Sequence, residues 1–329
     1  MKLITVEEHY SSATIGDKIR ELLENSDSPL LRAVNPPKAT DASFDPVNEI
    51  GDIRVAFMDS RGIDMQIISY AHVLPGILDA SISIGLCQTV NNDMHEKTSV
   101  YPDRFKCFAH LPLGDGNEAA KELERCVKEL GFVGAMISGR YLNISYDDPY
   151  YYPIYEKAVE LDVPIYMHPT MVDHEITEKY YKGNWSDRVT SLFAGQGIGW
   201  HYDVGVQIVR MILAGVFDKY PDLKIMTGHW GEVVSYYMYR LDNLNEAVSL
   251  KKPISDYFKE NIYVNPSGII NEAQFRFCLD TFGVDHIMWG GDYPFINAQN
   301  LKKMLEEYDL AQEDKEKIAH GNAERILKI

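Results

Sequence analysis

Four short motifs in this chain contain acidic or imidazole side chains, the groups that bind divalent metal ions and transfer protons. They are EEH at residues 7–9, MHPT at 167–170, GHWGE at 228–232 and GGDYPF at 290–295. Each follows a short apolar run, so each is predicted to lie at the carboxyl end of a β-strand. Because side chains alternate along a strand, Glu7 and His9 are expected to share one face, with Glu8 on the other.

These strand ends would supply a mixed oxygen and nitrogen ligand set. The metal-competent side chains are Glu7 with His9, then His168, His229 and Asp292. Carboxylate oxygens and imidazole nitrogens suit Zn²⁺ or Mn²⁺, and they suit Cu(I) or an iron–sulfur cluster poorly. Glu7 and His9 are therefore predicted to form half of a metal site.

Each motif also has an ordinary structural explanation. EEH could be a solvated strand end, and His168 could be a buried histidine with a backbone partner. Asp292 could cap a turn or helix, and His229 with Glu232 could begin a helix whose dipole favours the carboxylate. The metal hypothesis is favoured because all of the motifs fall at the same end of the predicted strands.

Strands alternate with helices along the whole chain. Eight apolar or β-branched runs are expected to be strands, at residues 2–6, 65–70, 104–111, 132–138, 163–168, 223–228, 262–265 and 286–290. Apolar side chains recur at helical spacing between the strands, as at Ala119, Leu123, Cys126 and Leu130 and at Val204, Ile208, Met211 and Ile212. With no linker in the chain, we predict a single α/β domain over residues 1–329, a (β/α)8 TIM barrel whose site lies at the carboxyl ends of its strands.

An open, doubly wound sheet is the alternative fold. The first strand lacks the GxGxxG turn that a dinucleotide-binding member of that class would show. Two connections, at residues 11–50 and 169–200, are longer than ordinary loops. Both leave from the end where barrel chemistry occurs, so we expect them to form long loops over the active site.

Composition narrows the class of protein. A net charge of −17 argues against a nucleic-acid partner, and it requires a local positive charge if the substrate is an anion. No apolar run approaches the roughly 20 residues of a membrane helix, and no secretory signal is recognised. The 4 cysteines are dispersed without CxxC spacing, as in a cytoplasmic protein with reduced thiols.

The motifs together resemble the amidohydrolase superfamily, through VPIYMHP, GHWGE, GGDYPF and the closing GNAERILKI. Within it they are similar to the branch named for aminocarboxymuconate semialdehyde decarboxylase. The EEH start, in place of HxH, is most similar to gamma-resorcylate and 2,3-dihydroxybenzoate decarboxylases. Asparagine expected near Ser138 and a second arginine expected near Leu244 are absent.

The resemblance implies a mononuclear metal site with Glu7, His9, His168 and Asp292 as ligands. It also implies that His229 and Glu232 act beside the metal without being its main ligands. A homodimer or homotetramer is the assembly that the resemblance suggests.

The leading functional hypothesis is metal-dependent, non-oxidative decarboxylation of a small aromatic (hydroxybenzoate-like) or enol carboxylic acid. The metal ion would chelate the substrate. Loss of CO₂ would leave a carbanion unless the carbon is protonated first, so an acid must be close by. Asp292 is predicted to be that acid, with His229 resupplying its proton and Glu232 fixing the imidazole tautomer.

Other residues are candidates for binding the substrate. Arg240 could reach a neighbouring subunit's pocket and pair with a substrate carboxylate, or it could form a salt bridge with Glu232 or Asp242. Aromatic walls are expected around the ring, and the candidates are Phe295, Trp200, Trp230 and Tyr293.

Two other functions are compatible with the sequence. The first is a metal-dependent hydrolase, an amidase or lactonase, in which the metal activates water and Asp292 acts as the base. The second is a metal-free barrel that binds a ligand without catalysis.

Overall fold

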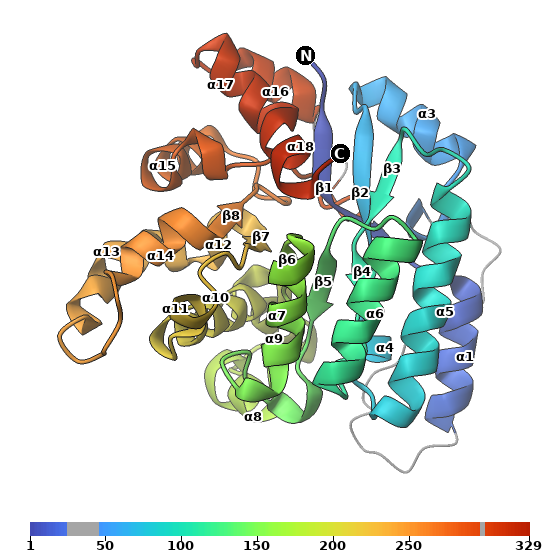
Figure 1. Ribbon diagram of the computed structural model, residues 1–329, viewed down its shortest axis with the longest axis horizontal. Coiled ribbons are helices and arrows are strands. Elements are labelled where there is room, and N and C mark those ends of the chain that lie inside the picture. The colour runs from blue at the N-terminus through green and yellow to red at the C-terminus, as the bar shows by residue number, and fades with distance from the viewer. Residues whose placement is uncertain (25–45, 297–299) are drawn as a thin grey trace.

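The computed structural model describes residues 1–24, 46–296 and 300–329, and its parallel strands alternate with helices along the chain (Figure 1). The strands are β1 Ile4–Tyr10, β2 Met65–Tyr70, β3 Phe105–Cys107, β4 Ala109–His110, β5 Ala135–Ser138, β6 Ile165–His168, β7 Ile225–Thr227 and β8 Ile262–Val264. They form a three-stranded sheet, β1-β2-β3, and a five-stranded sheet, β4-β5-β6-β7-β8.

The two sheets join to close a barrel. At one junction, the Phe108 N–H donates to the Ile68 carbonyl at 2.9 Å. At the other, parallel bridges connect the segment 287–289 to Val264 on β8 and to Thr5 on β1. The eight segments predicted as strands therefore form one closed barrel, which confirms the predicted fold class.

Several strand boundaries differ from the prediction. β1 continues through EEH to Tyr10, and its register against β2 shifts between Thr5 and Glu8. The predicted strand at 104–111 is divided into β3 and β4, and residues 286–290 form isolated bridges in place of a full strand. β5 begins after Gly134, which has a φ of +152° and where a Cβ would lie 2.5 Å from the Pro164 carbonyl oxygen.

Helices surround the barrel, with α1, α5 and α6 side by side along one flank in Figure 1. The first helices are α1 Ala13–Glu24, α3 Asp52–Arg61, α4 Leu74–Ile77, α5 Ala80–Thr98, α6 Gly116–Glu129, α7 Tyr152–Leu161, α8 His174–Ile176 and α9 Asp187–Leu192. The rest are α10 Gly199–Leu213, α11 Val216–Lys219, α12 His229–Glu232, α13 Val234–Leu241, α14 Ile254–Asn261, α15 Glu272–Phe282, α16 Leu301–Glu307, α17 Gln312–Glu316 and α18 Asn322–Leu327.

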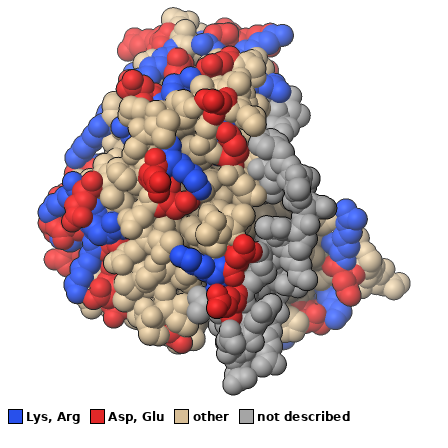
Figure 2. All heavy atoms as spheres, turned by 90° about the vertical axis from the view of Figure 1, so that its right-hand side faces the viewer, with Lys and Arg blue, Asp and Glu red and all other residues tan. Residues whose placement is uncertain are grey.

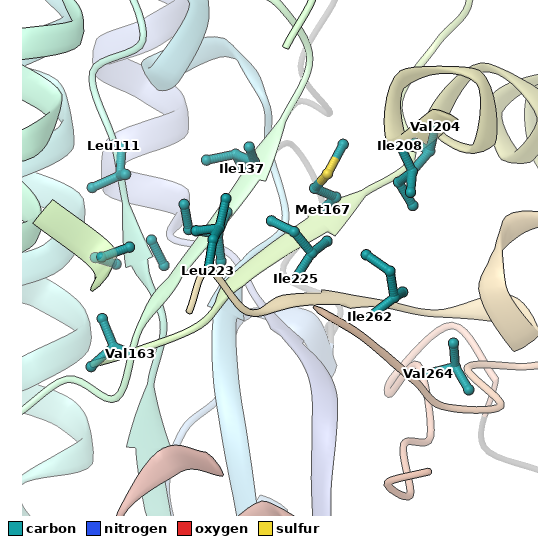
Figure 3. Close-up of a cluster of buried hydrophobic side chains, with 14 of the residues drawn as sticks. Leu111, Ile137, Val163, Met167, Val204, Ile208, Leu223, Ile225, Ile262 and Val264 are labelled. Atoms are coloured by element: carbon teal, nitrogen blue, oxygen red, sulfur yellow. The ribbon is translucent and has the colours of Figure 1, made fainter. Parts of the chain in front are cut away.

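Two apolar clusters use alternate faces of the strands. Outward-facing residues such as Met167 and Ile225 lie toward Val204 and Ile208 of α10 (Figure 3). Their strand neighbours form the second cluster with α18, and it contains Ile4, Val6, Ile67, Phe108, Met136, Tyr166, Met226, Tyr263, Met288 and Ile326. Both predicted helical stripes are buried except at Leu130, which ends α6.

The two long connections contain helices. The first includes α1, while residues 25–45 lie outside the described residues. The second includes α8, α9 and two π-helical turns at Thr177–Tyr181 and Phe193–Gly197. Coverage of the site by these segments stays a prediction.

The distribution of charged side chains and the state of the cysteines can be compared with the expectations from composition. On the face shown in Figure 2, acidic and basic side chains are interspersed. All four cysteines are buried free thiols. Within the described ranges, no helix combines the length and apolar character needed to cross a bilayer.

Candidate active site

The structure brings the four predicted ligands together at the carboxyl ends of the strands. The donor atoms of Glu7, His9 and His168 lie within 4.8 Å of one another. His168 Nε2 is 3.4 Å from Glu7 Oε1, and His9 Nε2 is 3.2 Å from Asp292 Oδ1. Side chains from both ends of the chain therefore meet at one point.

Within the described part of the chain, two potential metal-ligand atoms at this point lack well-aligned hydrogen-bond partners, as expected of a site that binds a divalent cation. Glu7 Oε1 and His9 Nε2 are buried and find no well-aligned hydrogen-bond partner among the described residues. Buried polar atoms without partners cost free energy, which a bound cation would recover. The His168 Nδ1–H donates to the Pro169 carbonyl at 2.7 Å, so the Nε2 lone pair faces the other donors.

Two residues that the sequence analysis did not select hold the other oxygen of Glu7. The Tyr166 hydroxyl and the Ser267 hydroxyl both donate to Glu7 Oε2. Tyr166 lies two residues before His168 on β6, so the alternation of side chains could have identified it. Ser267 follows β8 in a loop and carries no comparable signal. Together they turn Oε1 of Glu7 toward the ligand cluster.

Glu8 faces away from the cluster, as predicted, and anchors the segment around Asp292. Its carboxylate accepts the N–H groups of Gly291 at 3.0 Å and Tyr293 at 3.1 Å. Asp292 between them has a φ of +57°, a left-handed conformation that is uncommon for residues other than glycine, although aspartate adopts it more often than most. Burial raises the pKa of Glu8 to about 7, although Arg54 and the two N–H groups favour the ionised form.

Arg54 ties the same region to the barrel. It is fully buried, and it donates to Gln66 Oε1 at 2.7 Å and to the His9 carbonyl at 2.8 Å. Burial lowers the pKa of Arg54 to about 10, while the charge of Glu8 favours the guanidinium. Arg54 and Glu8 therefore support the backbone at His9 and on both sides of Asp292, two of the predicted ligands.

His229 and Glu232 form the predicted pair beside the ligand cluster, and His201 joins them. His229 Nδ1 is 2.8 Å from Glu232 Oε1, and His201 Nδ1 is 2.8 Å from Glu232 Oε2. The Trp200 indole N–H donates to His201 Nε2 at 2.9 Å. A fully buried carboxylate is therefore held between two imidazoles.

The electrostatic environment favours an ion pair between His229 and Glu232. Burial alone would lower the pKa of His229, but the carboxylate of Glu232, with the charges of Glu7 and Asp292, raises it to about 9. Burial opposes ionisation of Glu232, yet His229 and His201 keep its pKa below the usual value. The carboxylate of Glu232 therefore favours the protonated form of the His229 imidazole, next to the predicted ligands.

The sequence analysis did not select His201. The centroid of its ring lies 4.2 Å from that of the His229 ring, and its Nδ1 contacts Glu232. His201 is on α10, and not at a strand end, so the search of strand ends could not select it. The only local signal is Gly205 one turn later, which allows α10 to approach Glu232 closely.

The predicted substrate-binding residues lie in different places. The Phe295 ring is 5.5 Å from the His9 ring, and the residue is 62% exposed. Arg240 is exposed near the end of α13, and within the described residues it forms neither of the predicted salt bridges.

The other predicted aromatic walls have different neighbours. Trp200 contacts His201. Trp230 is buried, and its indole N–H donates to the Ile269 carbonyl at 2.6 Å. The ring of Tyr293 packs against Phe57 with centroids 4.5 Å apart. Of these aromatic residues, Phe295 combines exposure with contact to a predicted ligand.

Comparison with known proteins shows what this chain is similar to. A family model described as Amidohydrolase matches residues 18–329. Decarboxylase orsB of Emericella nidulans is 34% identical over 99% of this chain and 97% of its own length. Gamma-resorcylate decarboxylase of Polaromonas sp. is 35% identical over 85% of this chain and 88% of its own. A crystal structure of dihydroxybenzoic acid decarboxylase from Polaromonas sp., with bound manganese and the inhibitor 2-nitroresorcinol, has a TM-score of 0.83, 30% identity, and coverage of 99% and 97%.

Proposed function

Because this chain belongs to the amidohydrolase family, we propose that it is a metal-dependent decarboxylase of a small aromatic acid that carries an ortho hydroxyl group. Similar proteins named as decarboxylases match most of the chain, and one of them holds manganese. The observation that carries the proposal is the pair of buried, unsatisfied donor atoms, Glu7 Oε1 and His9 Nε2, beside His168 and Asp292.

The proposed metal ligands are Glu7, His9, His168 and Asp292. A divalent cation, Mn²⁺ or Zn²⁺, held by these side chains would bind the carboxylate and the ortho oxygen of the substrate and balance their charge. A cationic centre is needed because the net charge of −17 otherwise repels an anionic substrate.

Asp292 is the proposed acid that protonates the ring carbon. The bond to the carboxylate then breaks, CO₂ leaves, and the electron pair of that bond restores the aromatic ring. His229 is the proposed source of the proton that Asp292 needs for the next turnover. Glu232 holds His229 through Nδ1 at 2.8 Å, which supports this role because it leaves Nε2 available.

Phe295 and Arg240 are the proposed substrate contacts. Phe295 would pack against the substrate ring, since its own ring lies beside His9. Arg240 would require a second subunit, because its side chain is exposed on α13. The same helix exposes Tyr236, Tyr237 and Tyr239, an aromatic surface typical of a protein interface. These exposed side chains support the proposal of a homodimer or homotetramer, and the buried free thiols support a cytoplasmic location.

Product analysis tests the function. The Mn²⁺-loaded and Zn²⁺-loaded protein is incubated with a panel of hydroxybenzoates, and CO₂ and the corresponding phenol are measured. Carboxylation of a phenol in bicarbonate is the expected reverse reaction. Release of an acid from lactones or amides, with inert hydroxybenzoates, would establish the hydrolase alternative. Purified protein that contains no metal and gains no thermal stability from either ion would establish the metal-free alternative.

A further inference from the structure

His201 makes contacts that the proposed chemistry does not use. An indole N–H can only donate, so the 2.9 Å contact from Trp200 makes His201 Nε2 an acceptor. The ring proton of His201 must then be on Nδ1, which lies 2.8 Å from Glu232 Oε2. Trp200 thereby selects the neutral tautomer that donates to Glu232.

We propose that His201 is a positioning residue for the proton-transfer pair His229–Glu232, and that Trp200 fixes its tautomer. This inference rests on the proposed decarboxylase function. His201 occupies Oε2 of the Glu232 carboxylate, so only Oε1 is available to His229. With both oxygens engaged, and with the Thr227 hydroxyl also donating to Oε1 at 3.4 Å, the carboxylate is held in one orientation and keeps Nδ1 of the His229 ring toward it.

The backbone around Glu232 needs this support. His229, Trp230, Glu232 and Val233 all have positive φ values, between 50° and 61°. Each costs free energy for a residue with a side chain, so surrounding contacts must maintain the conformation. α10 supplies such a contact because Gly205 has no side chain: a Cβ there would lie 2.4 Å from the Glu232 carbonyl oxygen. His201 is one turn before Gly205 on the same helix face, which brings its ring to the carboxylate.

A neutral His201 also avoids electrostatic repulsion with the protonated form of His229. The two imidazole rings are 4.2 Å apart, so a second positive charge on His201 would oppose the protonated form of His229. Protonating His201 Nε2 would require the loss of the Trp200 hydrogen bond. The residue can therefore hold Glu232 in place without competing with His229 for charge.

A second cation is the rival explanation for this cluster. One donor atom from each of His201, His229 and Glu232 lies within 4.8 Å of the others. The positioning proposal is favoured because the carboxylate oxygens and the three imidazole nitrogens described above already have hydrogen-bond partners. By contrast, unsatisfied atoms mark the Glu7 and His9 cluster.

Four variants of the full-length, Mn²⁺-loaded protein test the proposal. His201→Ala removes the donor, His201→Asn keeps an N–H donor near the Nδ1 position, and Trp200→Phe keeps a ring without its N–H. His286→Ala is the matched control, because the His286 ring stacks on Tyr263 and its Nδ1 donates to the Ile262 carbonyl, away from the hydrogen bonds of Glu232. We expect His201→Ala to lower kcat about 10- to 100-fold with KM changed less than twofold, as for other residues that orient functional side chains. His201→Asn should recover most of that loss, and the control should retain wild-type kcat.

Imidazole ¹⁵N NMR of the metal-free protein gives a readout that is independent of turnover. We expect wild-type His201 to be neutral and protonated on Nδ1, and Trp200→Phe to lose that single tautomer. A wild-type kcat in His201→Ala, a loss that His201→Asn does not recover, or a second bound equivalent of Mn²⁺ that disappears in His201→Ala would overturn the proposal. Inactivity of the wild type toward every phenolic acid would instead overturn the decarboxylase function on which it rests.

Discussion

Glu8 and Asp292 are coupled through the backbone, although their side chains do not meet. The Glu8 carboxylate accepts the N–H groups of the residues on either side of Asp292, Gly291 and Tyr293, at 3.0 and 3.1 Å. The Asp292 N–H itself donates to the Glu7 carbonyl at 2.9 Å. Adjacent residues of β1 therefore have separate tasks: Glu7 and His9 present donor atoms, and Glu8 holds the fourth proposed ligand in its left-handed conformation.

Glu8→Gln should weaken metal binding without removing any proposed ligand. Glutamine has one acceptor oxygen, so one of the two N–H groups loses its partner and Asp292 is no longer held from both sides. We expect metal affinity to fall about 10- to 100-fold and stability by roughly 1.5–3 kcal/mol. Calorimetric titration with Mn²⁺ and urea unfolding measure the two effects. Glu175→Gln, at an exposed position on α8, is the control and should change neither quantity.

Removal of the metal should lower thermal stability in the wild type only. A cation bound only by the native state contributes about 2.7 kcal/mol when it is present at 100 times its Kd. We expect Mn²⁺ to raise Tm and a chelator to reverse the rise. In Glu7→Gln and His9→Ala, the increment should disappear, because the first removes the negative charge of the Glu7 ligand and the second removes the unsatisfied Nε2 of His9. An unchanged increment in both variants would place the cation elsewhere.

The sequence predicted the position of the ligand cluster because strand ends can be identified locally. In a closed parallel barrel, the carboxyl ends of the strands meet, so the strand assignments for His168 and Asp292 implied their proximity to Glu7 and His9. The last predicted strand, at residues 286–290, lies in the expected place although it forms only isolated bridges. Its apolar residues identify the position, but its pairing is too short to form a full strand.

Tertiary contacts that lack a local pattern could not be predicted. His201 reaches Glu232 only because α10 packs closely at Gly205, and helical spacing alone does not indicate which helix will approach. The capture of Gly291 and Tyr293 by Glu8 depends on barrel closure between the two ends of the chain. A hydrophobic pattern also cannot show where a positive φ marks the start of a strand, as at Gly134 just before β5.

Phe295→Ala should affect substrate binding more than chemistry. The ring is exposed and lies 5.5 Å from the His9 ring, so it can stack on a bound aromatic acid without touching the proton path. An aromatic pair contributes about 0.5–1.5 kcal/mol beyond area burial, which corresponds to a rise in KM of roughly 2- to 12-fold. We expect kcat to change less than threefold. Val100→Ala, which shortens a 67% exposed apolar side chain after the end of α5, is the control and should leave both constants unchanged.

His110 should make stability fall as the solution becomes acidic. It is buried at the end of β4, and burial, together with the charge of His72, lowers its pKa to about 4. In the unfolded chain an ordinary histidine titrates near pH 6.5. Between pH 6.5 and pH 4, the unfolded state therefore binds a proton that the native state does not, and unfolding becomes easier as pH falls.

The full loss from this histidine corresponds to roughly 3 kcal/mol at pH 4, and none of it is expected above pH 7. His110→Gln removes the titrating group, so the free energy of unfolding should depend less steeply on pH between 6.5 and 4 than in the wild type. Urea unfolding in chelator at pH 7.5, 6.5, 5.5 and 4.5 measures the two slopes, and the slopes decide the matter whatever the absolute stability of the variant. His174→Gln, at an exposed site on α8, should keep the wild-type slope. Equal slopes in the wild type and His110→Gln would mean that His110 accepts its proton in the native state as easily as in the unfolded chain.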